Sequence, residues 1–343
     1  MFRKIVKTTL VLVYLVIIAG ATVRMTGSGM GCPDWPKCFG YYIPPTQQSQ
    51  LEWHPEHQYK KGQVIILNET LQVANSSFTS TKTFNKNNWS TYTKHDYAIF
   101  NPTHTWVEYI NRLFGALAGI AVFIMAIASF RKWKTNKKIT LLSWLNVFLM
   151  GFQAWLGATV VYSHLAPLRI TIHMVVALVI VALILYILHL ASKTKKTTHR
   201  YNKQLRQLFI WATVITLIQV VLGTEVRAFI DFKVKEIGYQ KEHWLANPDF
   251  WFYIHRSFSI LVVAVSLYIW YFNKKIKANY KLVNWVVLLV FIEVITGLAM
   301  YYFHFPFSTQ AIHLVVASVL FGLQYYLILQ IKNAKNLSAK TIQ

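Results

Sequence analysis

The chain has 343 residues, of which 55% are hydrophobic, 15% are aromatic and only 14% are charged. This composition lies outside the range of soluble globular domains and indicates a membrane protein with several spans. The net charge of +23 is also typical of nucleic-acid binding, but basic loops that contact anionic lipid headgroups account for it better. We therefore expect membrane lipid, and no nucleic acid, as a partner.

Eight apolar stretches are long enough to cross a hydrocarbon core of about 30 Å, which takes roughly 20 helical residues. The predicted fold class is therefore an all-α membrane protein with eight transmembrane helices. The stretches lie near residues 5–24, 105–130, 140–162, 168–191, 206–225, 251–272, 283–303 and 308–331.

Basic residues concentrate at the N-terminus, at the C-terminus and in alternate connections. The segments 1–7, 131–138, 193–206, 274–281 and 332–340 hold 21 of the 35 Lys and Arg residues and none of the 12 acidic ones. Loops that stay on the cytoplasmic side of a membrane are rich in Lys and Arg. We therefore predict a multi-pass protein of the cell (inner) membrane with both termini cytoplasmic. The first span also fits a cleavable secretory signal, although the repeat described below favours a retained helix.

This orientation places two of the longer connections on the outer side. Residues 25–104 form a long loop rich in Asn, Thr and Ser, and its little periodicity gives no basis for assigning secondary structure there. The second, about 228–250, contains Trp244, Glu242 and Asp249. The inner connections are too short for a soluble catalytic domain, so we expect any chemistry within the helices or at their outer face.

The two cysteines of the chain, Cys32 and Cys38, lie in the long outer loop. Outside the cytoplasm such a pair is usually disulfide-bonded. A structural disulfide and a redox-active one both stay open, because exposed or strained disulfides have the higher potentials that suit exchange. A metal site is the weakest alternative, since no His follows at zinc-finger spacing.

The two halves of the chain repeat a set of polar residues. This pattern predicts two parallel-repeat four-helix bundles related by an axis along the membrane normal: residues 1–192, with the outer loop 25–104, and residues 193–343. Gly20 and Gly223 end the first and fifth spans in similar contexts, and Gly157 matches Gly297. The polar matches are Tyr109-Ile110-Asn111-Arg112 with Tyr253-Ile254-His255-Arg256, and His164 and His173 with His304 and His313.

In the second half, His255 and His313 lie just inside the outer ends of their spans, about 6–8 Å deep at 1.5 Å per residue. An ionisable side chain within an apolar span is costly and marks a functional-site candidate. Two neutral imidazoles that face each other in a bundle suit a six-coordinate haem iron, and Arg256 is placed to meet a haem propionate. The alternative for either histidine is an ordinary interior hydrogen bond.

The first half differs because Asn111 stands where the second half has His255. A pair of imidazoles therefore does not form there by the same geometry. Glu108, Asn111 and Arg112 share one helix face because of their spacing, and His173 comes from another span. This set fits an open site that holds a reactive ligand. The alternative is a Glu108–Arg112 ion pair of structural value only.

Three features of the sequence occur together: the stretch Thr26-Gly27-Ser28-Gly29-Met30-Gly31-Cys32-Pro33-Asp34-Trp35-Pro36-Lys37-Cys38, then Glu108-Tyr109-Ile110-Asn111-Arg112, and the histidines that open spans four, six and eight. Together they resemble the haem A synthase family, and the resemblance covers all eight spans. It implies an oxidoreductase acting on a CH group, which oxidises the C8 methyl group of haem O to the formyl group of haem A for terminal oxidases. It also implies a haem b cofactor in the C-terminal bundle, haem O in the N-terminal bundle, and contact with haem O synthase (protohaem farnesyltransferase).

Carried over to this sequence, the resemblance implies that His255 and His313 ligate the haem b iron and that His173 ligates the substrate haem iron. Glu108 matches the family's important acidic residue. It would accept a proton or stabilise a cationic intermediate while the methyl group is oxidised in two-electron steps to a gem-diol-like intermediate that loses water. Cys32 and Cys38 match the family's outer cysteine pair.

The departure from the family is Asn111, where many members have His. Asn111 would then contact a haem-bound water or leave the position open, and His104 is a substitute ligand to consider. His164 and His304 are expected at the membrane interface or at a propionate.

Two other functions fit parts of the pattern. One is a non-enzymatic haem carrier or assembly factor, and the other is a di-haem membrane electron-transfer protein, against which Asn111 argues. The electron acceptor, homo-oligomerisation and the entry route of haem O stay open.

Overall fold

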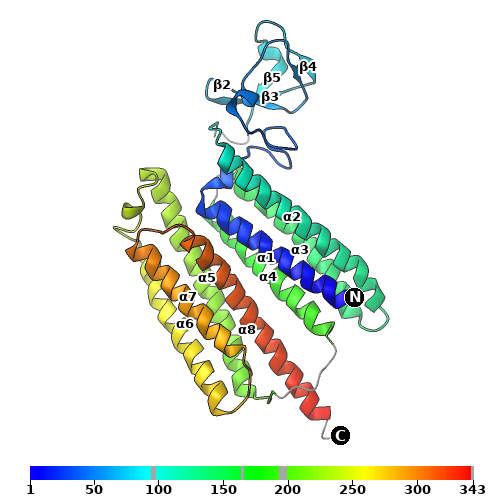
Figure 1. Ribbon diagram of the computed structural model, residues 1–343, viewed down its shortest axis with the longest axis vertical. Helices are drawn as coiled ribbons and strands as arrows, with labels where there is room; N and C mark the ends of the chain where they lie inside the picture. The colour runs from blue at the N-terminus through cyan, green and yellow to red at the C-terminus, as the bar shows by residue number, and fades with distance from the viewer. Residues whose placement is uncertain (94–97, 164–165, 193–198, 341–343) are drawn as a thin grey trace.

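In the computed structural model the chain is described for residues 1–93, 98–163, 166–192 and 199–340. Within these ranges the structure has eight helices that are long and apolar enough to cross a membrane, as predicted for an all-α membrane protein. Figure 1 shows them as α1 (Phe2–Met25), α2 (Pro102–Ser129), α3 (Lys137–Tyr162), α4 (Pro167–Leu190), α5 (Lys203–Ile237), α6 (Phe250–Lys275), α7 (Val283–Tyr302) and α8 (Thr309–Lys340).

The helices pack in two groups of four. Helix α1 contacts α2 and α4, and α3 contacts the same two helices. In the second group α5 contacts α6 and α8, and α7 contacts the same two helices. The groups lie side by side, and the seam between them is formed where α1 and α4 pack against α8 and where α4 packs against α5 (Figure 1).

Each group has its own apolar core, while its outer surface is apolar as well. Ile180, Val181 and Ile184 of α4 are fully or almost fully buried in the first core, and Phe209 and Ile269 are fully buried in the second. Large side chains point outward at the same time, including Phe148, Ile260 and Phe291, which are 61–70% exposed. A helix that is apolar on all sides suits a lipid environment.

Polar side chains mark where several helices begin. Asn101 and Asn202 accept hydrogen bonds from the third residue after them, His104 N and Leu205 N, at 3.2 and 2.8 Å. Asp249, which the sequence places in an outer loop, caps α6 by accepting a bond from Phe252 N at 3.1 Å. Such caps satisfy backbone N–H groups that have no partner within the helix.

Helix α5 is longer than the predicted span 206–225, since it continues to Ile237. The charged residues after Val226 end the hydrophobic stretch but not the helix. Ion pairs within the helix support this last part, with Arg227–Asp231 at 3.0 Å and Lys233–Glu236 at 2.7 Å. The helix ends at Gly238, whose φ of 68° suits a glycine at that position, so the second outer connection is shorter than 228–250.

The long outer loop, to which no secondary structure could be assigned from the sequence, contains short strands. Strands β1 (Gln58–Tyr59) and β4 (Phe78–Thr79) pair with each other, and β2 (Val64–Leu67), β3 (Thr70–Ala74) and β5 (Trp89–Thr91) form an antiparallel sheet in the order β2-β3-β5. Asn68 and Glu69 join β2 to β3 with positive φ, as in a two-residue hairpin turn. Strands of two to five residues are too short to show a clear alternation in the sequence.

Candidate functional site

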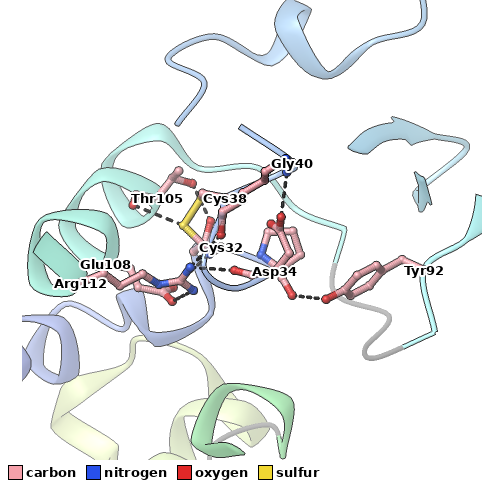
Figure 2. Close-up of a disulfide and its surroundings, with 11 residues drawn as sticks. Cys32, Asp34, Cys38, Gly40, Tyr92, Thr105, Glu108 and Arg112 are labelled. Atoms are coloured by element: carbon pink, nitrogen blue, oxygen red, sulfur yellow. Dashed lines mark hydrogen bonds and ion pairs between the residues drawn. A yellow bond between two sulfur atoms is a disulfide. The ribbon is translucent and has the colours of Figure 1, made fainter. Parts of the chain in front are cut away.

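The outer loop docks on the beginning of α2 through its disulfide (Figure 2). Cys32 and Cys38 are bonded to each other, and both side chains are fully buried. The backbone N–H of Cys32 donates a hydrogen bond to Glu108 Oε2 at 3.0 Å, and the Thr105 hydroxyl donates one to the carbonyl of Gly31 at 2.7 Å. The predicted disulfide is therefore present, and it lies directly on the helix that carries Glu108.

Glu108 forms the ion pair that was the structural alternative for this residue. Arg112 Nη2 lies 2.5 Å from Glu108 Oε1, and Glu108 is only 4% exposed. The other terminal nitrogen, Arg112 Nη1, donates to the carbonyls of Asp34 and Lys37 at 2.7 and 2.9 Å (Figure 2). Arg112 thus connects Glu108 to the turn between the two cysteines.

Asp34 and Tyr92 hold the same turn from the other side (Figure 2). Gly40 donates its backbone N–H to Asp34 Oδ2 at 2.9 Å, and the Tyr92 hydroxyl donates to the carbonyl of Pro33. Burial raises the pKa of the Asp34 carboxyl group above its ordinary value, although the Gly40 N–H acts in the opposite direction. Burial also raises the pKa of Tyr92, so its hydroxyl stays a neutral donor at neutral pH.

In the second group of helices, His255 of α6 and His313 of α8 face each other. Their ring centroids are 6.4 Å apart, and the ring planes make an angle of 66°. An imidazole nitrogen lies about 2 Å from a bound transition metal, so two rings on opposite sides of one metal have centroids roughly 6 Å apart. The spacing of this pair therefore fits axial ligation of a haem iron.

Each of the four repeat-matched polar positions packs against a glycine of the preceding helix. A Cβ atom on Gly223 of α5 would lie 3.1 Å from His255 Cε1, and one on Gly157 of α3 would lie 3.4 Å from His173 Cε1. The corresponding distances are 3.8 Å from Gly297 to His313 Cε1 and 3.8 Å from Gly20 to Asn111 Oδ1. The absence of a side chain leaves room for the imidazole or amide at each position.

In the first group, His173 and Asn111 carry buried polar atoms with no hydrogen-bond partner among the described residues, namely His173 Nδ1 and Asn111 Oδ1. Gln153 of α3 donates its amide to the backbone carbonyl of His173 at 2.9 Å and leaves the ring free. Buried polar atoms without partners are costly. Their presence at a matched position fits a site that is completed by a ligand.

The remaining predicted residues lie at or near the ends of helices. Arg256 is exposed, and its guanidinium group stacks over the ring of Tyr253 at 5.2 Å. His104 is half-buried in the first turn of α2, one turn before Glu108. His304 is exposed in the connection between α7 and α8 with a φ of 54°. His164 lies outside the described residues.

A charged cluster at the seam is one feature that sequence reasoning missed. Arg24 of α1 forms an ion pair with Asp231 of α5, and Arg227 contacts the same carboxylate at 3.0 Å. Arg227 also donates to Gln310 of α8 and, at 3.2 Å, to the carbonyl of Arg24. Arg24 and Arg227 come four residues after Gly20 and Gly223, so both guanidinium groups lie about one helical turn closer to the C-terminal ends of α1 and α5.

Glu293 of α7 is the second missed residue. Its Oε2 atom lies 3.0 Å from His313 Nδ1, and its side chain is 16% exposed. A signal was available, because Glu293 is the only charged residue of the apolar span 283–303, and a carboxylate at membrane depth is costly.

Comparison with known proteins agrees with this architecture. The model of the COX15-CtaA family, described as cytochrome oxidase assembly protein, matches residues 3–86 and 60–325. A haem A synthase of Flavobacterium johnsoniae is 23% identical over 92% of this chain and 93% of its own length, and one of Shouchella clausii is 24% identical over 94% of each. A haem A synthase of Shewanella oneidensis is 25% identical over 64% of this chain and 54% of its own length. The chain belongs to the COX15-CtaA family of cytochrome oxidase assembly proteins.

Proposed function

We propose that this protein is a haem A synthase, an oxidoreductase that converts the C8 methyl group of haem O to the formyl group of haem A. Relatives with that name align along almost the whole chain. Within the structure, the proposal depends most on the facing rings of His255 and His313. A carrier needs no second haem, whereas an oxidising enzyme needs a route for electrons.

The cofactor site lies in the helices of residues 193–343. His255 and His313 would hold haem b through one ring nitrogen each, and Gly223 leaves room beside the first of these rings. When bound, haem b supplies one-electron transfer. Arg256 and Arg227 are the guanidinium groups placed toward the outer face, where they would meet the propionates.

The substrate site lies in the helices of residues 1–192. His173 would ligate the iron of haem O, and Asn111, in place of a second histidine, would contact a water molecule or leave that side open. Glu108 lies three residues before Asn111 on α2, so the two share a face. Its carboxylate is held in place by Arg112 and by the N–H of Cys32, and in that position it would accept a proton or stabilise positive charge.

The setting of the reaction follows from the charges and from the substrate. Both termini would lie in the cytoplasm and the disulfide loop on the outer side of the cell (inner) membrane, because the inner connections are basic. Haem O synthase, a protohaem farnesyltransferase, is the partner that would supply the substrate. The disulfide loop closes the outer end of α2 next to Glu108, so the chemistry would occur close to that face.

The test is co-expression of the chain with a haem O synthase in cells that lack haem A, followed by chromatography of extracted haems and pyridine haemochrome spectra. Haem A should accumulate only when both proteins are present. Persistence of haem O with haem bound to the protein would indicate a carrier. Two low-spin haems without haem A would indicate an electron-transfer protein.

A further inference from the structure

Two side chains of α7 meet the same ring atom of His313. Glu293 Oε2 lies 3.0 Å from His313 Nδ1, and Thr296 Oγ1 lies 2.8 Å from it. The Thr296 hydroxyl also lies 2.8 Å from the backbone carbonyl of Ile292 and 3.0 Å from that of Glu293. Because an ionised carboxylate only accepts hydrogen bonds, its contact with His313 requires the hydrogen on Nδ1. Thr296 then accepts from the same N–H and donates its own hydrogen to a backbone carbonyl.

This arrangement determines which nitrogen of His313 is available to a metal. A neutral imidazole has one N–H and one free lone pair. With the hydrogen on Nδ1 and directed at Glu293 and Thr296, the lone pair is on Nε2. The ring is thus held in one tautomer by contacts that involve α7 alone.

Among the described residues, the other two candidate ligands lack an acceptor at Nδ1, and the ring of His255 instead contacts an amide, with Gln219 Nε2 at 3.5 Å from His255 Nε2. His173 Nδ1 and His255 Nδ1 are buried with no hydrogen-bond partner in the part of the chain that the structure describes. Gln153 precedes Glu293 by 140 residues, the same spacing that relates Gly157 to Gly297. Its amide donates to the backbone carbonyl of His173 at 2.9 Å, so the matched position in the first half provides no acceptor to the ring.

We propose that Glu293 is a positioning residue for the cofactor haem, which accepts the Nδ1–H of His313 and lowers the reduction potential of the iron that His313 ligates. The proposal rests on the proposed function, in which His255 and His313 hold haem b. A carboxylate that accepts the second N–H of a metal-bound histidine fixes the ring and raises the basicity of the ligand. A more basic axial ligand stabilises the oxidised iron, and hydrogen bonding of this kind is one way in which proteins tune haem.

The location of Glu293 supports a role toward the haem. Its second oxygen, Oε1, is buried and has no hydrogen-bond partner among the described residues. A carboxyl group in an apolar span is costly, and a glutamine, as at position 153, would make the same α7–α8 contact at lower cost. The two sites therefore differ in ligand basicity as well as in ligand number.

The test is a redox titration of the purified full-length protein with its haem, in which the absorbance of the reduced haem is measured at each potential. For Glu293→Gln we expect the ratio of reduced to oxidised cofactor haem at a fixed potential to rise at least about tenfold, equal to ~59 mV for a one-electron couple. Glu293→Asp, which keeps the carboxylate, should shift the ratio less. Glu236→Gln, which removes a half-exposed carboxylate paired with Lys233, is the matched control and should leave the ratio unchanged.

A purely structural hydrogen bond would lower the thermal stability of Glu293→Gln and leave the potential of its haem as in the parent protein. That outcome would overturn the proposal. If Glu293→Gln does not fold, Glu293→Asp decides, because its shorter side chain draws the carboxylate away from His313 Nδ1. It should raise the ratio by a smaller factor, and an unchanged ratio there would overturn the proposal equally.

The failure of the proposed function has a different signature. It would appear in the parent protein as a haem spectrum that His313→Ala and His255→Ala leave unchanged, before any potential is compared. A low-spin spectrum that both substitutions abolish, together with equal potentials for the parent and Glu293→Gln, would reject only the role of Glu293.

Discussion

The backbone N–H of Cys32 donates a hydrogen bond of 3.0 Å to Glu108 Oε2, across 76 residues of sequence. The carboxylate that the family resemblance connects with the chemistry therefore also holds the disulfide loop on α2. Arg112 extends this contact by binding Glu108 and the carbonyls of Asp34 and Lys37. A substitution of Glu108 thus has a structural and a chemical consequence, and the two must be separated.

Glu108→Gln and Glu108→Ala separate them. The glutamine keeps an acceptor for the N–H of Cys32 and has nearly the same volume, but it carries no charge. We expect both variants to retain the low-spin cofactor haem and to yield at least about a hundredfold less haem A, the usual scale of a lost acid–base group. Haem A would be measured by chromatography of extracted haems. Near-normal yield from Glu108→Gln with loss only in Glu108→Ala would assign Glu108 to the loop alone.

Gly223→Ala should weaken the cofactor site. The new Cβ would lie 3.1 Å from His255 Cε1, so the imidazole must move away from its position opposite His313. We expect a lower haem content per protein, measured by pyridine haemochrome. Gly119→Ala, in α2 with nothing within 4 Å of the added Cβ, is the matched control and should keep its haem, since alanine favours a helix by about 1 kcal/mol over glycine.

Asp231→Asn should loosen the seam between the two groups of helices. Asp231 binds Arg24 of α1 and Arg227 of α5, and its side chain is 22% exposed. Hydrogen bonds to charged groups contribute about 2 kcal/mol each, so we expect a clear drop in the midpoint of thermal unfolding in detergent. Glu236→Gln removes an exposed pair with Lys233 and should cost less than about 1 kcal/mol. Equal effects of the two substitutions would show that the seam cluster does not stabilise the fold.

Asp34→Asn should change how stability depends on pH. Burial raises the pKa of Asp34 above its ordinary value of 3.8, so the folded protein binds this proton more tightly than the unfolded chain does. The resulting stabilisation is complete below the ordinary value and is lost as pH rises through the raised pKa. The variant stays neutral and keeps an oxygen for the Gly40 N–H. It should therefore be more stable than the parent at neutral pH and equal to it below the ordinary value.

Thermal unfolding at the two pH values measures this difference. Glu69→Gln, at the exposed turn between β2 and β3, makes the same change of charge and should leave the pH dependence unaltered. If Asp34→Asn has the same unfolding midpoint as the parent protein at every pH, the role assigned to the burial of Asp34 is contradicted.

Loss of the disulfide should destabilise the outer loop without unfolding the helices. The bond closes a short loop of residues 32–38, for which loop-closure entropy predicts about 2–3 kcal/mol. A double substitution of Cys32 and Cys38 to Ala is expected to lower the unfolding midpoint and to expose the loop to proteolysis. Retention of the cofactor haem spectrum would show that α5–α8 are intact. Its loss would contradict the expectation that the disulfide stabilises the outer loop and not the helices α5–α8.

The prediction from sequence was most accurate for features that are local. Six of the eight helices begin and end within a few residues of the predicted spans, whereas α5 and α8 continue to Ile237 and Lys340, beyond the predicted ends at 225 and 331. In α5, ion pairs continue the helix past its apolar part. The strands of the outer loop were missed because their packing around Tyr59 and Trp89 joins residues that are distant in the sequence.

Among the site residues, the sequence marked His173, His255, His313 and Glu108 because each is ionisable and lies in an apolar stretch. Glu293 carries the same signal, but the matched residue of the first half, Gln153, is neutral, so the repeat does not mark this position. The contact between Glu293 and His313 depends on how α7 and α8 are rotated against each other, which helical periodicity alone does not specify.

The sequence by itself determined that the chain spans a membrane eight times and that its halves carry matched polar positions, since hydrophobicity and residue type are properties of single segments. Only the tertiary structure decided which of these residues meet. It placed the ring of His313 opposite His255 and against Glu293, joined Arg24 to Asp231 across the seam, and set the disulfide on Glu108. These contacts arise between helices, where the side chains that pack around each polar group select one arrangement.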